Sequence, residues 1–212
     1  MTQKKRVYAY FDGSNFYHLC KKNYGIKNVD ILQLCNLTIN QLTEEILKIK
    51  YFNSPVSQQA NLIVSRIQQR FFAKISRLPF VEVILGKLVE RPLNNIHINC
   101  PICKHQMAET LNCPKCGTPQ RIVDCKKTSE KGVDVNIAIT MLLDGIENKY
   151  DQVLLFSSDA DFSPAIKYIK KIGKEVVYCR FPQPITSELL QVCSEVRVIP
   201  KEDRENSPLG PF

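Results

Sequence analysis

Long apolar segments are missing from this sequence of 212 residues, although 44% of its residues are hydrophobic. No apolar run reaches the ~18 residues that would indicate a membrane-spanning helix. The first residues, MTQKKRVYAYF, also lack the extended apolar region and the small-residue cleavage site of a secretory signal peptide. These two absences predict a cytoplasmic protein without a membrane partner.

Two further absences limit the folds that the chain can adopt. The sequence contains no internal repeat, and it lacks the aromatic signature of RRM-type RNA-binding domains. The chain is long enough to bury one good core but short for two full domains, which predicts one domain with a small addition. Its formal net charge of +8 suits a polyanionic partner.

Short apolar runs alternate with amphipathic stretches along the chain, which predicts an α/β fold with three α/β/α layers around a central, mostly parallel sheet. Strands are predicted at Val7–Phe11, Ile46–Phe52, Val81–Leu85, Gln152–Phe156, Glu175–Cys179 and Glu195–Ile199. Helices are predicted at Asn15–Lys22, Asp30–Leu42, Ser57–Leu78, Val133–Gly145, Ser163–Ile172 and Ser187–Cys193. The apolar line of the third helix consists of Ile63, Ile67, Phe71 and Ile75.

Four aspartates stand where strands end or a helix begins: Asp12, Asp134, Asp159 and Asp161. In an open parallel sheet the carboxyl ends of the strands lie at one rim, so acids from distant parts of the sequence are expected to converge there. Asp134 would join them from the first turn of the helix that follows Gly132. Asp159 and Asp161 would point the same way if their segment is extended.

Clustered carboxylates need a compensating charge, because two unit charges about 4 Å apart repel by roughly 4 kcal/mol at an effective dielectric of about 20. Mg²⁺ or Mn²⁺ is the expected compensator, since both ions take oxygen ligands and substrate phosphates. A single aspartate after a strand is more often a helix cap or a turn residue, but four in this arrangement are more specific. Asn15 either contacts bound water or substrate, or caps the first helix.

Two other metal-binding α/β patterns fit the sequence poorly. Haloacid-dehalogenase-like phosphatases need a second aspartate two residues after the first, where this chain has Ser14. Integrin-type sites need a hydroxyl four residues after the aspartate, where Phe16 stands. Both alternatives are therefore disfavoured.

The segments FDGSNF, KGVDVNIAITML and SSDADFSPAI, followed by a GKEVV strand, resemble the NYN-domain family of PIN-like ribonucleases, in its LabA-like branch. The resemblance implies a PIN-like domain over residues 1–200 that cleaves RNA to products with 5′-phosphates. It also implies that Asp12, Asp134, Asp159 and Asp161 bind catalytic Mg²⁺ or Mn²⁺, with Asn15 as a polar partner. The SGD usual in the family is replaced by Ser157, Ser158 and Asp159, a loss of glycine that could tighten the approach of substrate.

Four of the nine cysteines occur as two closely spaced pairs, in CPIC and CPKCG. This spacing predicts a structural Zn²⁺ ion bound by Cys100, Cys103, Cys113 and Cys116 in a zinc-ribbon-like insertion over residues 95–121. A reduced Cys-rich loop or a redox switch is the alternative. Because cysteines fill all four positions, the ion would not be catalytic. The tail over residues 201–212 is predicted to be disordered.

The insertion precedes Lys131 and Asp134, so it is expected to overhang the acidic rim. It would act as an RNA clamp, or as a docking site for a homodimer or a protein partner. Lys131 itself is either a phosphate contact or a plain surface charge. The alternative to a nuclease is a non-catalytic RNA-binding module, or a protein-interaction module that works through the zinc ribbon.

Overall fold

The computed structural model of the protein describes residues 3–25, 29–56, 61–92, 102–103, 110–112, 114–121, 126–182 and 188–199. The predicted disordered tail and two of the four predicted zinc ligands, Cys100 and Cys113, lie outside these ranges. Within the described residues, no helix combines the length and the apolar character needed to cross a bilayer.

A single parallel sheet of six strands forms the centre of the protein, in the order β10-β9-β8-β1-β2-β3. The strands are β1 (Lys5–Asp12), β2 (Glu44–Asn53), β3 (Val81–Leu85), β8 (Gln152–Phe156), β9 (Glu175–Arg180) and β10 (Glu195–Val198). Each corresponds to one of the six strands expected from the sequence. The prediction of an α/β fold with a mostly parallel sheet is therefore confirmed.

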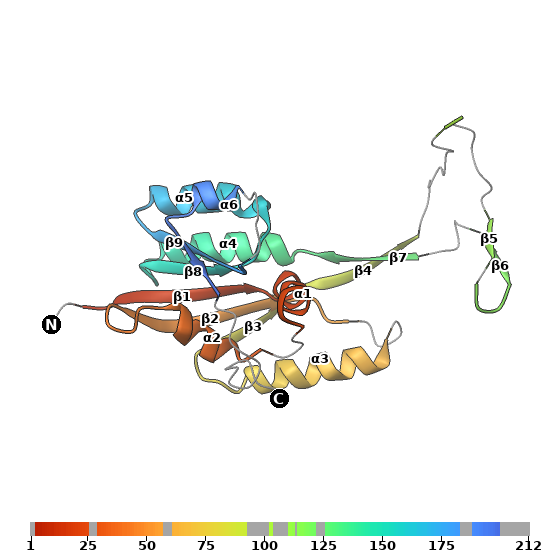
Figure 1. Ribbon diagram of the computed structural model, residues 1–212, viewed down its shortest axis with the longest axis horizontal. Helices are drawn as coiled ribbons and strands as arrows, with labels where there is room; N and C mark the ends of the chain where they lie inside the picture. The colour runs from red at the N-terminus through yellow and green to blue at the C-terminus, as the bar shows by residue number, and fades with distance from the viewer. Residues whose placement is uncertain are drawn as a thin grey trace.

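Helices cover both faces of the sheet and make three layers (Figure 1). One face carries α1 (Gly13–Tyr24), α2 (Ile31–Thr38) and α3 (Leu62–Ile75), and the other carries α4 (Val133–Ile146), α5 (Ser163–Lys171) and α6 (Leu189–Val192). Side chains alternate along β1 between the two cores: Ala9 and Phe11 pack on the first face, and Tyr10 on the second. Burial on both faces explains why β1 is a nearly continuous apolar run.

The order of the strands reverses between β1 and β8. From β1 the chain moves outward to β2 and β3, and it later returns to β8 beside β1 before moving outward again to β9 and β10. The helix after β1 lies on one face and the helix after β8 lies on the other. Open α/β sheets bind their ligands in the crevice at such a switch point, beyond the carboxyl ends of the strands.

The largest differences from the predicted helix boundaries are at the start of the third helix and the end of the second. The third helix begins at Leu62, after the N-cap Asn61, whose side chain accepts a hydrogen bond of 3.0 Å from the amide of Val64. Ile63 and Ile67 are 72% and 57% exposed, so the predicted apolar line is wrong in its first half. In Figure 1 this half of α3 extends past the ends of the strands of the central sheet, which leaves the two side chains exposed.

The second helix is also shorter than predicted. It ends at Thr38, because Ile39 has an extended backbone with φ −89° and ψ 156°. The stretch from Asn40 to Leu42 that the prediction included is a turn leading into β2.

A two-stranded antiparallel ribbon that the sequence did not predict stands between β3 and α4. It consists of β4 (Lys87–Pro92) and β7 (Lys126–Lys131), and it projects away from the body of the protein (Figure 1). A shorter antiparallel pair, β5 (Thr110–Asn112) with β6 (Pro119–Arg121), lies within the predicted insertion.

Candidate active site at the strand ends

Asp12 is the last residue of β1 and the N-cap of α1, and it is only 4% exposed. Its Oδ1 accepts a hydrogen bond of 3.1 Å from the amide of Asn15. Its Oδ2 accepts one of 3.0 Å from the hydroxyl of Ser157, just after β8. The carboxylate is therefore held from both strands of the switch point, and capping accounts for one of its oxygens.

Asn15 connects the same two strand ends from the other side. Its Oδ1 accepts hydrogen bonds of 3.1 Å from both the amide and the hydroxyl of Ser158. Because Asp12 supplies the cap of α1, the side chain of Asn15 is not needed for capping. Asn15 therefore ties the start of α1 to the end of β8, and its role in the site stays a prediction.

The segment after β8 is a turn rather than an extended strand. Residues Ala160–Phe162 form a 3₁₀ turn whose N-cap is Asp159, and the Oδ1 of Asp159 accepts a hydrogen bond of 2.9 Å from the amide of Asp161. The amide of Asp159 in turn donates to the Ser157 hydroxyl at 3.2 Å. The prediction that the two aspartates point the same way along an extended segment is therefore unsupported, and Asp161 is exposed.

Asp134 comes to the site from a distant part of the sequence. It lies in the first turn of α4, two residues after the N-cap Gly132, which has the left-handed φ of 85° that glycine tolerates best. An open depression at the rim of the sheet is lined by Asp12, Ser14, Asn15, His18, Leu19 and Asp134. Asp12 and Asp134 thus line one depression, and their role as metal ligands stays a prediction. Asp159 is linked to Asp12 through hydrogen bonds to Ser157. The amide of Asp161 donates a hydrogen bond to Asp159.

His18 is a member of this depression that sequence reasoning missed. It is exposed and lies one helical turn after Ser14 on α1, so both side chains fall on the same side of the helix. Its spacing from Ser14 was the available signal, although nothing in the sequence shows that this side of α1 faces the acids.

The donor chemistry of the depression fits a hard divalent cation. Among the described residues, no three His, Cys, Asp or Glu side chains are grouped closely enough to hold one ion by themselves. Mg²⁺ is usually bound through one or two carboxylates, and waters and substrate phosphates complete its shell. The pair formed by Asp12 and Asp134 suits that kind of binding.

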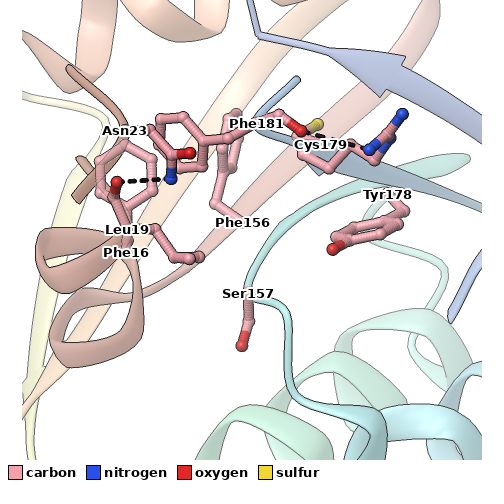
Figure 2. Close-up of a pocket in the computed structure, with 9 residues that line it drawn as sticks. Phe16, Leu19, Asn23, Phe156, Ser157, Tyr178, Cys179 and Phe181 are labelled. Atoms are coloured by element: carbon pink, nitrogen blue, oxygen red, sulfur yellow. Dashed lines mark hydrogen bonds between the residues drawn. The ribbon is translucent and has the colours of Figure 1, made fainter. Parts of the chain in front are cut away.

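Aromatic packing behind the site keeps the two strand ends together. The rings of Phe11 and Phe156 stack with centroids 4.1 Å apart, and Phe16 of α1 packs edge-on against Phe156 at 5.9 Å. A cavity of about 20 Å³ lies within this cluster, and the side chain of Ser157 turns away from the aromatic rings (Figure 2). A space of that size holds a water molecule at most, so the aromatic cluster serves as packing behind the site.

The predicted zinc ligands are only partly within the described chain. Cys103 and Cys116 are both exposed, and Cys100 and Cys113 fall outside the described residues, so the zinc site stays a prediction. In the body, Cys20 and Cys35 are buried, and burial raises the pKa of the Cys20 thiol to about 12. These two cysteines therefore behave as small apolar core residues.

Comparison with known proteins adds three findings. A sequence profile of the NYN domain matches residues 6–200. The chain is 24% identical, over 187 residues and 80% of its length, to 6-hydroxy-3-succinoylpyridine 3-monooxygenase HspA from Pseudomonas putida. It spans 57% of the length of that curated relative. A crystal structure of a protein of unknown function from Vibrio parahaemolyticus is similar with a TM-score of 0.56 at 18% identity, covering 94% of this chain and 97% of that one, and this likeness shows the fold alone.

Proposed function

Because the chain belongs to the NYN domain family of PIN-like proteins, we propose that it is a metal-dependent ribonuclease that hydrolyses phosphodiester bonds of RNA. One observation carries the proposal: Asp12 and Asp134, from distant parts of the sequence, line the same depression at the switch point of the sheet. Asn15 lines it as well. A basic chain around an acidic centre is the charge arrangement that a polyanionic substrate requires.

In this proposal Asp12 and Asp134 hold Mg²⁺ or Mn²⁺, and Asp159 and Asp161 contribute through waters. The bound ion would polarise the scissile phosphate and supply a water of lowered pKa. The hydrogen bonds from Ser157 and Asn15 fix the Asp12 carboxylate before substrate arrives, so no reorganisation is needed during the reaction. The exposed ring of His18, which lines the same depression, would contact the phosphate or the leaving group.

The name of the curated relative raises a second candidate, the hydroxylation of a small aromatic substrate. Small-molecule sites are usually enclosed and mostly apolar. The depression is open, and five of its six lining residues, all except Leu19, are polar. Its open shape therefore favours an extended polyanion over a small aromatic ring.

We also propose, as separate features of the same protein, a structural Zn²⁺ bound by the four paired cysteines and an RNA clamp formed by the insertion. Deleting residues 95–121 tests the clamp. Unchanged RNA affinity in a folded deletion variant would rule it out.

The function is tested by following the cleavage of labelled single-stranded RNA with Mn²⁺. Wild-type protein is expected to cleave, and EDTA is expected to stop the reaction because it removes the ion. Asp134→Asn should abolish cleavage while leaving the melting temperature unchanged, since Asp134 is exposed.

The matched control is Asp151→Asn, which removes the same charge at the opposite end of β8 and should keep full activity. Full activity in Asp134→Asn would refute the site. RNA that shifts in a gel without being cut would indicate a binding module instead.

A further inference from the structure

The ribbon of β4 and β7 is fixed to the body beside the candidate site. Gly86, directly before β4, lies so close to its neighbours that a Cβ there would stand 2.6 Å from Val133 Cγ2 and 2.8 Å from Ser54 Oγ. Its amide donates a hydrogen bond of 2.8 Å to the carbonyl of Asn53. At the other strand, β7 passes through Gly132 directly into the turn of α4 that carries Asp134. The base of the ribbon is therefore anchored next to the depression.

The register of the ribbon separates its charges between two faces. Alternate positions of a strand belong to opposite faces, so the pairs Lys87–Lys131, Val89–Ser129 and Arg91–Lys127 share one face. The pairs Leu88–Glu130, Glu90–Thr128 and Pro92–Lys126 share the other. The first face has four basic residues and no acid, and the second has two acids and one basic residue. We call the first one the basic face.

The basic face places cations directly opposite one another across the two strands. Lys87 is directly opposite Lys131, and both side chains are exposed. Like charges directly opposite one another on neighbouring strands destabilise the pairing. The register repeats the arrangement four residues further along, with Arg91 opposite Lys127. A polyanion would remove this repulsion by lying along the face.

We propose that the basic face, made of Lys87, Arg91, Lys127 and Lys131, binds the phosphate backbone of the RNA strand that enters the depression. This inference rests on the proposed ribonuclease function. The two basic pairs are separated by four residues, or about 14 Å at the usual rise of a strand, which spans several phosphates. Such contacts hold an RNA strand in position and are independent of its sequence.

Binding is measured in the Asp134→Asn background, so that the RNA stays intact, by fluorescence anisotropy of a labelled single-stranded RNA over a range of salt concentrations. Lys87→Gln and Lys131→Gln together are expected to lower the affinity roughly tenfold. They should also reduce the slope of log affinity against log salt by about 1.4, because each phosphate contact on a single strand contributes about 0.7.

The matched control is Lys126→Gln, which removes one positive charge from the other face of the same ribbon. It is expected to leave the salt slope unchanged, whereas Lys87→Gln alone should lower it by about 0.7. Equal effects of Lys87→Gln and Lys126→Gln would overturn the proposal, because binding would then not depend on the face.

A stability measurement separates this role from a purely structural one. Lys87→Glu places opposite charges across the ribbon, so it should raise the melting temperature while weakening RNA binding. If wild-type protein cleaves RNA but the double glutamine variant keeps its affinity and salt slope, the ribbon proposal fails and the ribonuclease proposal stands. If wild-type protein neither binds nor cleaves RNA, both fail.

Discussion

At the scale of single residues, the site depends on side chains that hold other side chains. Ser157 donates its hydroxyl hydrogen to Asp12 and accepts from the amide of Asp159, so one small residue fixes the positions of two of the predicted ligands. The sequence indicated the four aspartates as candidate site residues, since each is placed after a predicted strand or at the start of a predicted helix. It did not show the exposed position of Asp161, because nothing in the letters SSDADF distinguishes a 3₁₀ turn from an extended segment.

Ser157→Ala is expected to lower RNA cleavage by about 10- to 100-fold, the usual cost of losing a residue that orients a metal ligand. The fold should remain, because the aromatic packing behind the strand ends is untouched. The control is Ser163→Ala, since the Ser163 hydroxyl is buried without a hydrogen-bond partner among the described residues. Steady-state cleavage rates of both variants check this expectation, and equal rates would mean that Ser157 positions nothing.

At the scale of secondary structure, the sequence predicted every strand of the central sheet because each is a short segment that contains β-branched or aromatic residues. The sequence-based prediction failed where apolar residues at a helical spacing are not buried. Ile63 and Ile67 repeat at a helical interval and yet are exposed, because the sheet ends before α3 does. The ribbon was missed for the opposite reason: β4 and β7 are largely polar, and the pairing of distant segments leaves no local signal.

The two halves of α3 should respond differently to substitution. Ile63→Lys is expected to change the free energy of unfolding by less than about 0.5 kcal/mol, because the side chain is already exposed. Phe72→Ala should cost about 3 to 5 kcal/mol, because Phe72 packs in the core on that face of the sheet. Urea unfolding of the two variants makes the comparison. A large loss in Ile63→Lys would show that another surface covers the first half of the helix.

At the scale of the whole molecule, an ion pair links the last strand to the other half of the sheet. Arg197 of β10 donates two hydrogen bonds of 2.7 Å to the carboxylate of Glu44 at the start of β2. Burial raises the pKa of Glu44, but hydrogen bonds from Arg197, the Asn40 amide and Gln152 outweigh it and hold the pKa at about 2, below the ordinary 4.5. No sequence pattern reveals a pair whose partners are so far apart along the chain.

This pair predicts how stability depends on pH. The pKa of Glu44 is lower in the folded state, so its contribution is complete above about pH 4.5 and is lost as the pH falls toward 2. At neutral pH, the free energy of unfolding of wild-type protein should be higher than that of Glu44→Gln by on the order of 2 kcal/mol. This difference should shrink as the pH falls from about 4.5 toward 2. Urea unfolding of both proteins at several pH values measures this difference. The control is Glu45→Gln, because Glu45 is the exposed neighbour of Glu44. A difference that stays constant down to pH 2 would contradict the assignment.

The separation of charge on the ribbon depends on the number of residues in each strand. Alternation has a period of two, so inserting or deleting a single residue near the start of β4 would move every later position of that strand to the other face. Glu90 would then stand where Arg91 stands now. Changes in the length of the ribbon are therefore compatible with a continuous cationic track only when they come in even numbers.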